Sequence, residues 1–167
     1  MTSYLYKHTQ SPSERLQLAV RAQHLRRWEV PRSTYPAGKI GYYSWRTFLA
    51  KRQAEMVVAM CREGGYTDEE AGEVGALVRK EGLKKRATTA TDADQSLGDE
   101  TQVLEDVACL VFLDDQFEGF EKGYEEEKVI SILQKTWAKM SQRGHELALQ
   151  IDMSDRAKGL VERALQG

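Results

Sequence analysis

The chain has 167 residues, a length that suits one domain whose core buries roughly two-thirds of the surface of the unfolded chain. Its 24 Lys and Arg against 26 Asp and Glu give a formal charge of −2, which excludes a global positive field that would attract nucleic acid or anionic lipid. No run reaches the roughly 18 apolar residues of a membrane span, and the first residues lack a signal-peptide core. We therefore expect a soluble, cytoplasmic protein with no membrane partner, whose Cys61 and Cys109 are reduced, buried thiols.

Helix signals dominate the first half of the chain. Residues 1–10 are interpreted as a polar N-terminal arm, after which Ser11-Pro12-Ser13-Glu14 predicts a helix start. That helix should run to Pro31, because proline ends a helix, and the prolines and glycines of residues 31–43 predict a loop. A second helix is expected from Ser44 to the Gly64-Gly65 pair. The capping-box residues Thr67-Asp68-Glu69-Glu70 predict a third helix with Glu81 facing inward.

The second half continues in the same way. Residues 84–99 lack apolar periodicity and are interpreted as a mobile surface loop. Further helices are expected over about residues 100–113, over 125–140 and from Ser154 onward, and no convincing strand or repeat is present. The fold class predicted is all-α, a single-domain bundle of about six helices in residues 11–167.

Residues 20–46 combine a histidine with arginines and aromatic side chains, a composition suited to holding an anion. A second cationic stretch, which contains Lys135 and Arg143, is predicted either to bind phosphate or carboxylate or to be an ordinary helix C-terminus. The candidate substrate-binding residues are Arg26, Arg27, Arg32, Tyr35, Trp45, Arg46, Lys135 and Arg143.

Two carboxylates lie on apolar helix faces. Asp106 is on the line through Val103 and Leu110, and a buried carboxylate costs several kcal/mol unless it is paired, so it needs a metal ion, Lys80 or an arginine. Glu55 lies at the edge of a Met-rich helix, where it either serves the site or pairs with a surface arginine. His24 points at least partly inward and is interpreted either as a metal ligand or as a core histidine with satisfied hydrogen bonds.

Several motifs carry a family resemblance. His24-Leu25-Arg26-Arg27-Trp28, Pro31 through Pro36, Leu104 through Leu113 and Arg143-Gly144-His145-Glu146 resemble the family catalogued as domain of unknown function 4202. The resemblance covers about residues 15–150 and implies no particular activity.

The chain also resembles the HD metal-dependent phosphohydrolases, which are all-α. His24 is similar to their first ligand and Asp106 to their last, but their defining His-Asp pair is absent, and Gln53-Ala54-Glu55 stands near its place. The resemblance implies a carboxylate-rich set of His24, Glu55, Glu81 and Asp106 holding Mg, Mn, Fe or Zn. A lysine, Lys80, could equally replace the metal, in which case no cofactor is needed.

Three functions remain open. The first is metal-dependent hydrolysis of a small phosphate-containing substrate, with catalytic residues Lys80, Glu81, Glu105 and Asp106. The second is metal-free acid–base chemistry on a small molecule by a lyase, isomerase or cyclase that uses the same residues. The third is a non-catalytic nucleotide- or RNA-binding module, against which the net charge argues.

Overall fold

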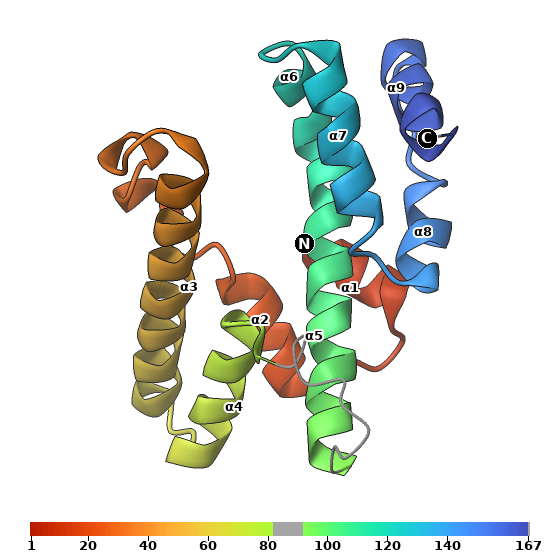
Figure 1. The fold of residues 1–167 in the computed structure, drawn as a ribbon. Coiled ribbons are helices and arrows are strands. Elements are labelled where there is room, and N and C mark those ends of the chain that lie inside the picture. Colours follow the sequence, from red (N-terminus) through yellow and green to blue (C-terminus); the bar gives the residue numbers. More distant parts are fainter. Residues whose placement is uncertain (82–91, 167) are drawn as a thin grey trace. The chain divides into compact units, whose positions relative to one another are not determined.

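The computed structural model describes residues 1–81 and 92–166, and these residues form helices and turns without a strand (Figure 1). The all-α class is therefore confirmed. The helices are more numerous than the six expected, because α1, α6 and α8 are short additional ones. The bounds are α1 Thr2–His8, α2 Glu14–Ala22, α3 Gly38–Glu63, α4 Asp68–Val78, α5 Asp92–Val111, α6 Phe117–Glu121, α7 Glu126–Trp137, α8 Gln142–Ala148 and α9 Asp155–Gln166. None of the described helices is long and apolar enough to cross a membrane.

The chain packs into two compact units, and each is described by itself. The first unit comprises residues 12–101, and the second comprises residues 3–11 together with residues from Gln102 onward. Helix α5 begins in the first unit and ends in the second.

In the first unit, α2, α3 and α4 pack against one another. The cap of α2 is Ser13, whose side chain accepts a hydrogen bond from Leu16 N, so the helix begins close to the expected place. It ends at Ala22, well before Pro31, and two short 3₁₀ turns, Arg27–Glu29 and Arg32–Thr34, follow. The buried core of this unit includes Leu16, Ala19, Val20, Trp45, Leu49, Ala54, Val57, Cys61, Ala71, Val74, Leu77 and Val78.

Helix α3 begins at Gly38, so the prediction of a loop through residue 43 was wrong. Glycine and proline do not break the helix here because both glycines lie at its first turn, where Gly41 packs directly on the carbonyl of Pro36. The predicted end is confirmed, since Gly64 follows the last helical residue and Gly65 has a φ of +92°.

The capping box of α4 is confirmed. Thr67 Oγ1 accepts a hydrogen bond from Glu70 N, and the Glu70 carboxylate accepts one from Thr67 N. The helix ends at Val78, so the inward position expected for Glu81 is wrong: Glu81 lies beyond the helix and is exposed. Helix α5 already begins at Asp92, which corrects the loop prediction for residues 92–99, while residues 84–91 lie outside the described part of the chain.

In the second unit, helix α1 replaces the expected polar arm because Tyr4 and Leu5 are buried. Helix α5 continues through one π-helical turn, Phe112–Gln116, into α6. The predicted helix over residues 125–140 is shorter: α7 ends at Trp137, and Ser141 caps the separate helix α8. The expected last helix is confirmed as α9, which packs on α7.

Cys61 and Cys109 are both buried and unbridged, as expected.

Candidate functional site

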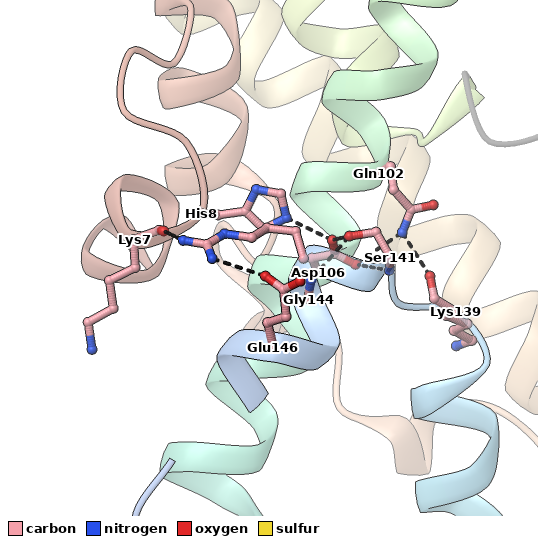
Figure 2. A network of polar contacts seen from close by, with 9 residues as sticks. Lys7, His8, Gln102, Asp106, Lys139, Ser141, Gly144 and Glu146 are labelled. Carbon is pink, nitrogen blue, oxygen red and sulfur yellow. Dashed lines mark hydrogen bonds and ion pairs between the residues drawn. The ribbon is translucent and has the colours of Figure 1, made fainter. Parts of the chain in front are cut away.

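Asp106 is the centre of a polar network within the second unit, shown in Figure 2. Its side chain on α5 is fully buried, with no exposed surface. Asp106 Oδ1 accepts hydrogen bonds from Ser141 N at 2.9 Å and from Gln102 Nε2 at 3.0 Å. Asp106 Oδ2 accepts from Ser141 Oγ and from His8 Nε2, the latter at 2.8 Å. Since an ionised carboxylate only accepts, Nε2 of His8 carries the proton. We call Asp106, His8, Gln102 and Ser141 the Asp106 network.

Local structure explains why the carboxylate lies there. Ser141 caps α8, and its Oγ accepts a hydrogen bond from Gly144 N at 3.1 Å while donating to Asp106. Gly144 lies in the first turn of α8, where a Cβ atom would be 2.8 Å from Asp106 Cγ. A side chain at position 144 would therefore push the helix away from Asp106.

Burial by itself raises the pKa of Asp106, but hydrogen bonds from His8, Ser141 and Gln102 outweigh that effect and hold the pKa below its ordinary value of 3.8. Asp106 therefore stays ionised inside the protein. The expectation that it is buried and needs partners is confirmed, but the partners differ from those expected from the sequence. No sequence pattern identifies two of these partners, His8 and Ser141. Gln102 stands four residues before Asp106 on the same helix, a spacing that could have identified it.

Other predicted residues of the second unit have ordinary partners. Glu105 is 7 % exposed, and its carboxylate lies 3.8 Å from Lys139 Nζ. Arg143 donates to the Lys7 carbonyl at 2.9 Å and pairs with Glu146 at 3.2 Å, so it ties α8 to α1. Lys135 lies exposed in the last turn of α7, where a cation favours the helix dipole.

The proposed metal ligands of the first unit are not gathered into a metal site. His24 is exposed, which corrects its expected inward position. Glu55 is also exposed and lies 3.8 Å from Lys51 on the same helix, and Glu81 pairs with Arg79 at 2.5 Å. Within residues 1–81 and 92–166, no group of three His, Cys, Asp or Glu side chains could hold a metal ion. We therefore derive no chemical step through a metal.

By contrast, some of the predicted substrate-binding residues do come together. The Arg27 guanidinium lies over the Trp45 ring, 4.6 Å from its centroid. The buried Trp45 side chain is itself fixed by a hydrogen bond from its Nε1 to the Val30 carbonyl, at 2.9 Å. Arg46, one residue further along α3, donates to Tyr42 Oη at 3.2 Å. We call Arg27, Tyr42, Trp45 and Arg46 the arginine–aromatic cluster.

The charges of this cluster repel each other. Burial and the neighbouring charge of Arg46 hold the pKa of Arg27 below its ordinary value. In the described part of the chain, neither arginine has a carboxylate partner within ion-pair distance. Among residues 1–81 and 92–166, the cluster is therefore a pair of positive charges without a paired carboxylate, beside a partly buried aromatic surface.

The other predicted substrate-binding residues of residues 20–46 already have partners within the protein. Arg26 and Arg52 both pair with Glu29. Arg32 donates to the carbonyls of Tyr35 and Pro36, at 2.9 Å each, and to that of Gly38 at 3.3 Å, so it stabilises the loop before α3. The Tyr35 ring packs on Phe48, with centroids 6.2 Å apart.

Two further positions are unusual, Lys80 for its backbone conformation and Gln53 for its side-chain nitrogen. Lys80 follows the end of α4 with a φ of +58°, a left-handed conformation that is unusual for lysine, and its side chain is partly buried. Gln53 on α3 is 5 % exposed, and its side-chain nitrogen has no hydrogen-bond partner among the described residues. No pattern in the sequence selects Gln53 as a site residue, because a glutamine inside a helix is ordinary.

The match to the family described as Domain of unknown function (DUF4202) covers residues 1–161. This range extends beyond residues 15–150, where the resemblance was expected, and it includes every member of both the Asp106 network and the arginine–aromatic cluster. No curated protein and no solved structure is similar enough to count as a match. The chain belongs to the DUF4202 family.

Proposed function

We propose that the first unit binds a small phosphate-containing molecule of the nucleotide type at the arginine–aromatic cluster. The observation that carries this proposal is the pairing of Arg27 with Arg46, two cations close enough to repel and without a carboxylate partner among the described residues. A phosphate between them removes the repulsion and forms charge-assisted hydrogen bonds with both guanidinium groups. Because Trp45 holds Arg27 in place, little side-chain entropy is lost on binding.

The exposed aromatic side chains around the cluster suit the rest of such a ligand. Tyr42 is 41 % exposed, and Tyr43 beside it is 57 % exposed, with their ring centroids 5.9 Å apart. Trp28, which follows Arg27 directly, is 75 % exposed. A nucleobase stacked on one such ring gains about 1–3 kcal/mol. Aromatic rings next to paired arginines favour a nucleotide over inorganic phosphate alone, and a single small ligand does not require the positive net charge that a long nucleic acid would.

This proposal predicts that AMP and ATP bind more tightly than inorganic phosphate, and that adenosine binds least. Arg27→Gln and Arg46→Gln should each weaken nucleotide binding by about tenfold or more, because each removes one charged donor. Arg27→Lys should restore only part of the affinity, since an ammonium group lacks the planar fork that both stacks on Trp45 and binds phosphate. Isothermal titration calorimetry measures these affinities, with tryptophan fluorescence as a second readout.

Arg62→Gln is the matched control. Arg62 lies on the same helix, α3, but is paired with Asp68 at 2.7 Å, so its loss should leave nucleotide binding unchanged. An equal affinity in wild type and Arg27→Gln would overturn the proposal, as would equal weakening by Arg62→Gln.

Metal-dependent hydrolysis of a small phosphate-containing substrate is proposed on the sequence pattern alone, including the HD-type resemblance, and the roles of Lys80, Glu81, Glu105 and Asp106 stay predictions. The measurement is metal content by mass spectrometry on untagged protein, repeated for His24→Ala and Asp106→Ala. Stoichiometric Mn, Fe, Zn or Mg that is lost from both variants supports a metal-dependent hydrolase. Protein that stays metal-free after reconstitution contradicts it and leaves the metal-free acid–base enzyme as the catalytic alternative.

A further inference from the structure

A cavity of about 250 Å³ lies within the second unit, between α7, the end of α8 and α9. Its walls are mostly apolar. They are formed by Leu113, Leu133, Thr136, Trp137, Ala148, Leu149, Ile151, Met153, Lys158, Val161, Glu162, Ala164 and Leu165. Since an apolar cavity of about 150 Å³ takes up benzene, this one has room for a larger apolar group. None of its lining residues belongs to the Asp106 network.

Two features of the surrounding structure distinguish this cavity from a packing defect. Leu113 reaches it from the π-helical turn between α5 and α6, and such turns are rare and frequently found at functional sites. At its edge, Leu149 is 68 % exposed and Leu165 is 43 % exposed, so apolar surface continues from the cavity toward solvent. An apolar ligand would cover both leucines as it entered.

Trp137 forms one wall and is held rigidly. Its indole stacks on the His145 ring with centroids 4.0 Å apart and planes within 4°, and the same histidine lies 2.9 Å from the Trp137 carbonyl through Nε2. A flat, fixed aromatic wall favours an aliphatic chain or a ring lying against it.

Lys158 determines which polar group the ligand should carry. Its Nζ lies 3.5 Å from the carboxylate of Asp152, which is fully exposed, so the cation at the cavity already holds a carboxylate in a weak, easily replaced pair. A ligand carboxylate can take the place of Asp152 without leaving a buried charge. Glu162 also lines the cavity and is exposed. Its negative charge repels a carboxylate, so the negative charge of the ligand must lie beside Lys158.

We infer that the cavity between α7, α8 and α9 binds a small carboxylic acid with an apolar tail, whose tail lies against Trp137 and whose carboxylate pairs with Lys158. The site is separate from the nucleotide site proposed above and uses none of its residues. Octanoate is a suitable probe because its chain matches the size of the cavity and its charge matches Lys158.

The protein of residues 1–167 is titrated with octanoate, octanol and octylamine while tryptophan fluorescence is followed in a Trp28→Phe background, in which Trp137 and the buried Trp45 remain. Octanoate is expected to bind about tenfold more tightly than octanol, because it adds a charge-assisted hydrogen bond, and octylamine is expected to bind least. Lys158→Gln should lower octanoate affinity about tenfold and leave octanol affinity unchanged.

Two filling variants test the location from opposite walls. Ala164→Phe and Ala148→Phe each place a ring where the tail should lie, and both alanines line the cavity at 6 % exposure. At least one is expected to keep wild-type helicity by circular dichroism while losing octanoate binding. Lys128→Gln, at an exposed lysine elsewhere on α7, is the charge control and should bind octanoate normally. Absence of octanoate binding to the wild type, or undiminished binding by a folded filling variant, would overturn the inference, as would equal affinity for all three probes.

Discussion

Asp106→Ala is expected to lower the free energy of unfolding by about 3–5 kcal/mol. The reason is the number of part-buried donors that lose this acceptor, although Gln102 Nε2 also donates to the Lys139 carbonyl at 2.8 Å. Ser141 N, Ser141 Oγ, Gln102 Nε2 and His8 Nε2 all point at this one carboxylate, and alanine accepts none of their hydrogen bonds. Chemical denaturation followed by circular dichroism measures the change.

Asp106→Asn should lose less stability. The amide oxygen can still accept from Ser141 N and Gln102, while the amide NH₂ can donate to Ser141 Oγ and to a His8 ring in its other tautomer. Asp115→Asn, at an exposed carboxylate after the same helix, is the matched control and should cause no measurable change. If Asp106→Ala were as stable as Asp115→Asn, the hydrogen bonds of the Asp106 network would not stabilise the fold.

The same network predicts a pH dependence with a definite sign. Because the folded-state pKa of Asp106 lies below its ordinary value of 3.8, its stabilising contribution is complete above about pH 4 and is lost as the pH falls through the folded-state pKa. The stability difference between wild type and Asp106→Asn should therefore shrink on acidification below pH 4. A difference that grew there would contradict a lowered pKa.

Local chemistry made much of the helical fold predictable. The cap at Thr67, the glycine stop at Gly64 and the start of α9 depend on residues within one turn, so the sequence contains all the necessary information. Helix α1 was missed because it is short and its stability depends on burying Tyr4 and Leu5, contacts that no local pattern reveals. The actual start of α3 was missed because proline and glycine usually break helices, and only packing shows why they do not here.

In the candidate sites too, some features follow from the local sequence and others depend on residues far away along the chain. An aspartate on an apolar face correctly predicted a buried carboxylate at Asp106. Its partners include His8 and Ser141, which are 98 and 35 residues away along the chain, and one sequence contains no sign of such pairs. For the arginines, composition predicted an anion site but could not separate Arg27 and Arg46 from Arg26 and Arg32. That distinction depends on Glu29 and on backbone carbonyls, which satisfy the second pair.

Gly41→Ala is expected to destabilise the first unit by about 3 kcal/mol and to lower its nucleotide affinity. A Cβ at position 41 would lie 2.0 Å from the Pro36 oxygen and 2.8 Å from its carbonyl carbon, and neither backbone atom can rotate away. The Pro36 carbonyl also accepts a hydrogen bond from Arg32, at 2.9 Å. The loop must therefore separate from α3, which would move the segment containing Arg27 away from Trp45 and Arg46.

Gly72→Ala provides the matched control, because Gly72 lies within α4 of the same unit and a Cβ there meets no atom within 4 Å. That substitution should stabilise the protein by about 0.5–1 kcal/mol through helix propensity alone. Urea denaturation of both variants, combined with calorimetric titration with AMP, separates packing from propensity. Equal stability of the two variants would show that the contact between Gly41 and Pro36 is not maintained in solution. A destabilised Gly41→Ala that still binds AMP normally would show instead that the loop before α3 does not position Arg27.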